Sequence, residues 1–226
     1  MLKKIIAFSA SYAMTEALQK GIMFFLMSLF TYYMTTEEYG IISSALIIIQ
    51  FLSVIFSLSS TAAISRYYFS YANNPEKLKE FIGSSFLLLF FTSLIFLFIC
   101  LFFGKPFFVW VFPDIEYHPY FIWIFLICAI QPFNLAYLAM LKAQQRIKRY
   151  SMLYSFFYIT QFGLMAITIL SRGMKQDGYI LSILISNIFF MLVVIGLLAK
   201  EACWSFKIAY IIPSFKYSLS FLPTEL

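Results

Sequence analysis

Long apolar stretches alternate with short polar segments along almost the whole chain. A helix needs roughly 20 mostly apolar residues to cross the hydrocarbon core of a bilayer, and six of the stretches reach that length. Residues 217–226 begin like one more membrane segment, which we interpret as the start of a truncated seventh helix. The pattern predicts an all-α fold, a polytopic membrane protein with a six-helix transmembrane bundle over residues 1–216. The expected spans are residues 9–34, 41–65, 81–103, 120–141, 150–170 and 178–199.

The composition supports lipid as the solvent for most of the chain. Hydrophobic residues make up 62% of the 226 positions and charged residues only 12%. A water-soluble domain is nearer half apolar and a quarter charged. A soluble fold of this length could not hide so much apolar surface, so the composition excludes an ordinary soluble domain.

The basic residues predict an orientation. The N-terminus and the connections at 66–80, 142–149 and 200–217 hold twelve of the sixteen Lys and Arg residues, and the opposite connections hold three. Basic residues concentrate in cytoplasmic loops, so the N-terminus is expected in the cytoplasm. The net charge of +6 is explained in this way, without a nucleic-acid partner.

The sequence TTEEYG, residues 35–40, is expected to form a short external connection between the first two spans. Thr35 and Glu38 have the spacing of a capping box, in which the hydroxyl and the carboxylate each accept from a free backbone N–H. The connection at 104–120 is longer and aromatic, as expected of a loop at the outer interface.

Charged residues inside the first span form a pattern of their own. Tyr12, Glu16 and Lys20 stand four residues apart and share one helix face, with Glu before Lys in the favourable order. Each buried charge costs about 2.5–3.5 kcal/mol on insertion scales, and pairing reduces that cost. Two interpretations remain open, a structural ion pair and part of a hydrophilic substrate path.

Uncharged polar residues also recur at helical spacing. The second span carries a stripe that serves either tight helix packing or the lining of a cavity: Ser43, Gln50, Ser53, Ser57 and Ser60. Other spans add Gln131, Pro132 and Asn134, then Gln161, and finally Asn187. Several helices therefore have a face that can contact water.

Catalytic and cofactor motifs are absent from the sequence. It contains no GxxxxGK[ST], no HExxH and no GxSxG, and its cysteines and single histidine form no metal-ligand pattern. The short connections leave no room for a catalytic domain. We therefore expect neither an enzyme nor a bound metal or cofactor.

Several stretches resemble a known family. The segment after the first span reads MTTEEYGIISSALIIIQFLSVIFSLSSTAAISRYYF, residues 34–69, and is followed by NNPEKLKEFIGSS. Further along come LAYLAMLKAQQRIKRYSMLYSF, residues 135–156, and the closing KYSLSFLPTEL. In order and spacing these resemble polysaccharide and O-antigen flippases of the multidrug/oligosaccharidyl-lipid/polysaccharide exporter superfamily.

The resemblance implies a fold and a function. Such proteins have two six-helix lobes, of which this chain would supply the first. They are understood to move a lipid-linked oligosaccharide on a polyprenyl diphosphate carrier across the cell inner (plasma) membrane. Membrane lipid, a C-terminal lobe and glycan-assembly proteins are the other partners expected. Lys20 and Arg66 would be the cations for a diphosphate or acidic sugar, although an arginine at the position of Arg66 more often serves as a cytoplasmic topology anchor. The alternatives are a multidrug or cation-coupled exporter of the same superfamily and a non-transporting scaffold subunit in glycan assembly.

Overall fold

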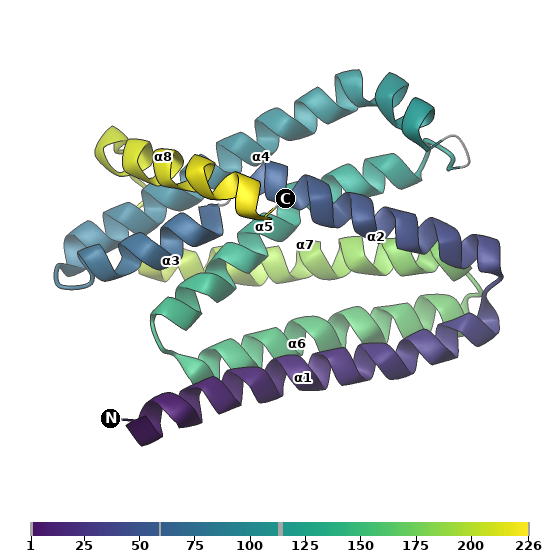
Figure 1. Cartoon of the computed structure of the whole chain (residues 1–226), viewed down its shortest axis with the longest axis horizontal. Coiled ribbons are helices and arrows are strands. Elements are labelled where there is room, and N and C mark those ends of the chain that lie inside the picture. Colours follow the sequence, from purple (N-terminus) through teal and green to yellow (C-terminus); the bar gives the residue numbers. More distant parts are fainter. Residues whose placement is uncertain (1, 59, 113–114, 226) are drawn as a thin grey trace.

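The computed structural model describes residues 2–58, 60–112 and 115–225, and for residues 2–9, 11, 29, 31 and 221–225 it describes the backbone only. All the regular structure in these ranges is helical (Figure 1). The elements are α1 (Leu2–Tyr33), α2 (Thr36–Ser57), α3 (Ser60–Tyr71), α4 (Pro75–Val111), α5 (Tyr120–Ala143), α6 (Ile147–Ala166), the π-helical turn η1 (Ile167–Ser171), α7 (Lys175–Glu201) and α8 (Ile208–Glu225).

Five helices in the described ranges are long and apolar enough to cross a membrane, which agrees with the predicted all-α membrane bundle. They are α2, α4, α5, α7 and the continuous run of α6 with η1. The predicted first span, residues 9–34, lies in α1 and is not among them. Its apolar residues are interrupted midway by Glu16, Gln19 and Lys20, so the structure supports five of the six expected spans.

The connections gather at two opposite ends of the bundle (Figure 1). One end holds the start of α1, the α3–α4 turn, the α5–α6 turn and the end of α7. The other end holds the α1–α2, α4–α5 and α6–α7 connections. The segments rich in Lys and Arg thus lie at the same end.

Helix α2 begins earlier than the sequence pattern indicated. Its N-cap is Thr35, whose hydroxyl accepts from the Glu38 N–H at 3.3 Å, while the Glu38 carboxylate accepts from the Thr35 N–H at 2.7 Å. This confirms the predicted capping box. Most of TTEEYG is therefore the first turn of a helix and not a loop, because the cap satisfies the free N–H groups at once.

The predicted second span, 41–65, is broken into α2 and α3. Leu58 caps α2 with φ +45°, a left-handed conformation that a residue with a side chain rarely adopts. Serine hydroxyls lie on both sides of the break: Ser57 donates to the Val54 carbonyl at 3.0 Å and Ser60 to the Ser57 carbonyl at 2.5 Å. The side chains thus satisfy carbonyls freed by the break.

Helix α4 is longer than the predicted span 81–103. Asn74 caps its start by accepting from the Lys77 N–H at 3.1 Å, and the helix continues through Pro106 to Val111. Much of the predicted outer loop 104–120 is therefore helical. At 1.5 Å per residue, its 37 residues extend about 55 Å, well beyond a bilayer core of about 30 Å.

Burial separates the central helix from the peripheral ones. In α5, 67% of the apolar window is buried, against 17% in α4. Helix α5 contacts α2, α3, α4, α6 and α7, whereas α1 lies along the edge against α6 and η1. The predicted seventh helix, expected from residue 217, corresponds to α8 and begins earlier, at Ile208. Helix α8 packs on α3 and α4.

Candidate functional site

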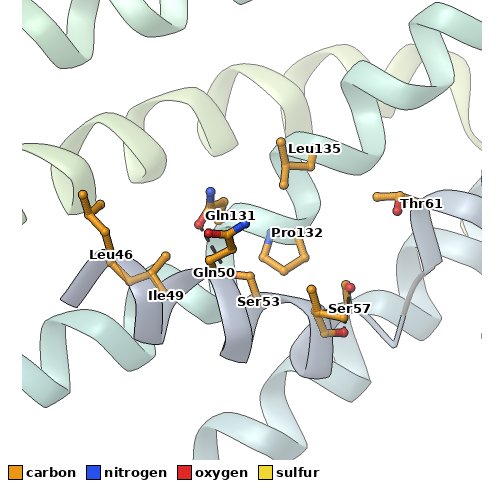
Figure 2. Close-up of a pocket in the computed structure, with 10 residues that line it drawn as sticks. Leu46, Ile49, Gln50, Ser53, Ser57, Thr61, Gln131, Pro132 and Leu135 are labelled. Atoms are coloured by element: carbon orange, nitrogen blue, oxygen red, sulfur yellow. Dashed lines mark hydrogen bonds between the residues drawn. The ribbon is translucent and has the colours of Figure 1, made fainter. Parts of the chain in front are cut away.

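A cleft of about 490 Å³ separates α2 from α5 (Figure 2). Polar side chains line its middle and one end, and aliphatic side chains line the remainder. The ten residues that line it are Leu46, Ile49, Gln50, Ser53, Val54, Ser57, Thr61, Gln131, Pro132 and Leu135. Two of the predicted site residues, Gln50 and Gln131, thus meet across one cavity.

The two glutamines enter the cleft from opposite walls (Figure 2). Gln50 is exposed on α2, and Gln131 is half-buried on α5. The side-chain oxygen of Gln131 accepts a hydrogen bond from the Ser53 hydroxyl at 3.3 Å. This bond orients the Gln131 amide and leaves its N–H groups for a ligand.

The helical stripe predicted on the second span is divided between the cleft and the protein interior. Ser53 and Ser57 line the cleft with Gln50, whereas Ser60 is buried and Ser43 lies outside the lining. Thr61, on the far side of the break at Leu58, closes the cleft at one end. Thr61 was not among the predicted residues, although it stands four residues after Ser57, a spacing that places both on one helix face.

Proline shapes the facing wall. Pro132 has no N–H, so the carbonyl four residues earlier in α5, that of Cys128, loses its usual helical donor. Cys128 is fully buried beside α2, where its thiol donates to the Ile49 carbonyl at 3.7 Å. The polar groups of this wall therefore come from a helix whose regular hydrogen bonding is interrupted.

All the groups lining this cleft are uncharged. Its polar members are two amides and three hydroxyls, and the rest are aliphatic or proline side chains. Amides and hydroxyls both donate and accept hydrogen bonds, so they match a neutral ligand rich in hydroxyl or amide groups. An isolated ion would find no counter-charge in this lining.

Asn134 and Asn187 lie in the protein interior and not in the cleft. Both are 1% exposed, and they meet between α5 and α7. The side-chain N–H₂ of Asn134 donates to the backbone and side-chain oxygens of Asn187 at 3.1 Å and 3.0 Å. These two predicted site residues therefore serve helix packing in this conformation.

The predicted ion pair of Glu16 with Lys20 is wrong. The carboxylate of Glu16 accepts from the Lys142 ammonium at 2.7 Å and from the Tyr150 hydroxyl at 3.2 Å, while Lys20 is exposed. Lys142 stands 126 residues away in the sequence, so local spacing could not identify it.

Lys142 lies at the end of α5, whereas the contact of Glu16 with Tyr150 belongs to a polar interface between α1 and α6. Tyr12 packs edge-to-face on Tyr150 with ring centroids 4.9 Å apart, and the hydroxyls of Thr15 and Ser151 lie 3.0 Å apart. The Tyr154 hydroxyl donates to Gln19 at 3.4 Å. Most of the polar face of α1 is therefore occupied by α6.

The remaining predicted site residues also lie away from the cleft. Arg66 is exposed on α3, and its guanidinium lies 4.8 Å from the ring centre of Tyr217. Gln161 is half-buried on α6, which does not contribute to the cleft lining. Of the residues singled out in the sequence, the cleft brings together Gln50 and Gln131 with Ser53, Ser57 and Pro132.

Comparison with models of known protein families, with curated proteins and with solved structures found no match to this chain. A functional conclusion therefore has to come from the polar cleft, the membrane-type helices and the sequence features that carry the family resemblance.

Proposed function

We propose that the chain forms one lobe of a membrane transporter that moves lipid-linked oligosaccharide from the cytoplasmic to the outer leaflet. The observation that carries this proposal is the cleft between α2 and α5. It places Gln50, Ser53 and Gln131 together between helices that expose many large apolar side chains. A bundle built only to occupy the membrane has no need of such a cavity.

The chemistry of the cleft suits the sugar part of this substrate. Sugar hydroxyls donate and accept hydrogen bonds, as do the amides and hydroxyls of the lining. An oligosaccharide cannot cross hydrocarbon unaided, because its polar groups would lose their partners there. The carrier chain is itself apolar and stays in lipid beside the exposed aliphatic residues Leu46 and Leu135.

The cytoplasmic end supplies the charge that a diphosphate requires. Arg66 lies five residues beyond Thr61 on α3, which corresponds to a rise of roughly 7 Å. Its guanidinium is exposed and is held by stacking on Tyr217, so it can still bind an anion. Lys20 is a second exposed cation, on α1.

Transport requires the cleft to open alternately to the two sides. In the general scheme for such transporters, two lobes rock about a site near the middle of the membrane. The break between α2 and α3 lies beside the cleft, where a discontinuous helix is tolerated because it lines a polar cavity. The N-terminus lies in the cytoplasm in this proposal, as the distribution of basic residues favours.

The proposal is tested in cells that depend on the gene. Deletion should cause lipid-linked oligosaccharide to accumulate in the cytoplasmic leaflet, and the wild-type gene should relieve it. Gln131→Leu should slow transfer about tenfold, as the loss of one or two ligand hydrogen bonds predicts. Gln161→Leu is the matched control, because Gln161 has the same side chain on a helix outside the cleft.

The outcomes separate the alternatives. If the protein is a scaffold subunit, deletion of the gene should abolish transfer of the oligosaccharide, whereas Gln131→Leu should leave transfer unchanged. A multidrug exporter would change drug accumulation and leave the surface glycan unchanged. Either result would overturn the proposal. For Gln131→Leu, the variant protein must be present at the normal level.

A further inference from the structure

The connection between α7 and α8 lies directly on α4. Residues 202–207 form neither helix nor strand, and their backbone crosses α4 at Gly83. A Cβ atom at position 83 would overlap the carbonyl oxygen of Cys203 and lie 2.7 Å from its carbonyl carbon. Only a glycine allows the two backbones to approach this closely.

Hydrogen bonds fix the connection at this crossing. The Cys203 N–H donates to the Lys79 carbonyl at 3.0 Å. The Ser84 hydroxyl donates to the Ser205 carbonyl at 2.5 Å and accepts from the Lys207 N–H at 3.3 Å. One short stretch of α4 thus satisfies three backbone groups of the α7–α8 connection.

An ion pair joins the last residue of the connection, Lys207, to Glu80 of α4. Glu80 accepts from the Lys207 ammonium at 2.5 Å through one carboxylate oxygen and from the Tyr210 hydroxyl at 3.2 Å through the other. The hydrogen bond to Glu80 raises the pKa of Lys207 above its ordinary value, because it stabilises the charged ammonium. Residue 210 already belongs to α8, so the contact continues into the helix.

Helix α8 is then held against α3. The rings of Tyr210 and Tyr71 lie edge-to-face with centroids 5.2 Å apart, and those of Tyr217 and Tyr67 lie 5.9 Å apart. Helix α3 packs on α5 as well as on α8, and its residue Thr61 closes one end of the cleft. A displacement of α8 therefore reaches the cleft through one short helix.

We propose that residues 202–207 act as a clamp that holds α8 on the α3–α4 hairpin, and that release of this clamp widens the cleft at Thr61. Gly83 permits the clamp to close, and Ser84 and Glu80 keep it closed. The inference does not depend on the substrate, since it concerns only contacts within the chain.

The clamp is tested by thiol labelling of the full protein in membranes. With Cys100, Cys128 and Cys203 replaced by Ala, Ser205→Cys places a thiol where the serine hydroxyl is now buried. Gly83→Val should raise its rate of reaction with a polar maleimide about tenfold, because it removes hydrogen bonds worth about 1.4 kcal/mol. Gly196→Val is the matched control, since a side chain at Gly196 meets open space.

A second variant preserves the glycine. The double substitution Ser84→Ala with Glu80→Gln should also accelerate labelling of Ser205→Cys, and it decides the question if Gly83→Val fails to give monodisperse protein. Unchanged labelling in a folded variant would overturn the clamp. The coupling is tested separately with Thr61→Cys, whose labelling should rise when the clamp is released. If Ser205→Cys reacts faster and Thr61→Cys does not, the coupling to the cleft is wrong.

Discussion

The side-chain amide of Asn134 donates to the side-chain oxygen of Asn187 across 3.0 Å, between the two helices with the most extensive contact in the described structure. The Asn187 amide in turn donates to the Ile183 carbonyl of its own helix at 2.9 Å. In lipid there is no hydrophobic force between helices, so such polar contacts and close packing set their relative position. This pair fixes α7 against the central helix α5 and thereby supports the wall that carries Gln131.

The coupling between these asparagines can be measured with a double-mutant cycle. Asn134→Ala, Asn187→Ala and the double variant should give a coupling free energy of about 0.6 kcal/mol, and at most about 1.7 kcal/mol, in favour of the native pair. The measurement is the free energy of unfolding in mixed micelles. Asn73→Ala, in the exposed α3–α4 turn, should leave the free energy of unfolding unchanged. A coupling energy of zero would contradict the structure.

Glu201 should contribute more to the free energy of unfolding than the other carboxylates at the end of the bundle that holds the α5–α6 turn. Its side chain is only 18% exposed, and it accepts from Arg146 at 3.0 Å, from Arg149 and from the Tyr137 hydroxyl at 3.4 Å. Glu201→Gln should lower the free energy of unfolding by about 1–2 kcal/mol, because two guanidinium groups lose their shared counter-charge.

The control for Glu201 is Glu76→Gln, an exposed acid in the first turn of α4. It should change the melting temperature of the purified protein far less than Glu201→Gln does. Equal effects of the two substitutions would show that Glu201 does not join α6 to α7.

The pair formed by Glu16 and Lys142 should contribute little. Their side chains are 38% and 46% exposed, so solvent screens the attraction and each single substitution should cost about 1 kcal/mol or less. The charge exchange Glu16→Lys with Lys142→Glu should recover most of the loss in melting temperature. Lys20→Met should have almost no effect. If Lys20→Met lowers the melting temperature more than Lys142→Met does, the ion-pair partner of Glu16 is Lys20 and not Lys142.

The proposed orientation is tested by labelling intact cells. In a cysteine-free background, Glu37→Cys lies at the end of the bundle that holds the α1–α2 connection, and Lys77→Cys and Lys148→Cys lie at the opposite end. An impermeant maleimide should react with Glu37→Cys in intact cells, and with the two lysine positions only after the membrane is opened. The reverse pattern would place the N-terminus outside.

Local features of the fold could be predicted from the sequence. The capping box of Thr35 and Glu38 follows from a spacing of three residues, so its two partners are visible together. Helical periodicity likewise placed Gln50, Ser53 and Ser57 on one face, which is the face that lines the cleft. In both cases the geometry depends on residues within a few turns of one another.

Features that depend on distant contacts could not be predicted. The break at Leu58 has neither glycine nor proline at the turning residue, and it is stabilised by the packing of α3 on α5 and α8. The extension of α4 through Pro106 was missed because proline there resembles the end of a helix. The sequence also does not indicate that Glu16 pairs with Lys142 or that Ser53 donates to Gln131. In both cases the two residues lie on segments that only the folded chain brings together.

The polar face that α1 presents to α6 has a consequence for biosynthesis. Glu16 depends on Tyr150, which is synthesised 134 positions later, and Gln19 depends on Tyr154. While the ribosome is still making the middle of the protein, the first segment has no partner for these groups, and hydrocarbon is a poor environment for them. Helix α1 can therefore reach its final position in the bundle only after α6 has been translated.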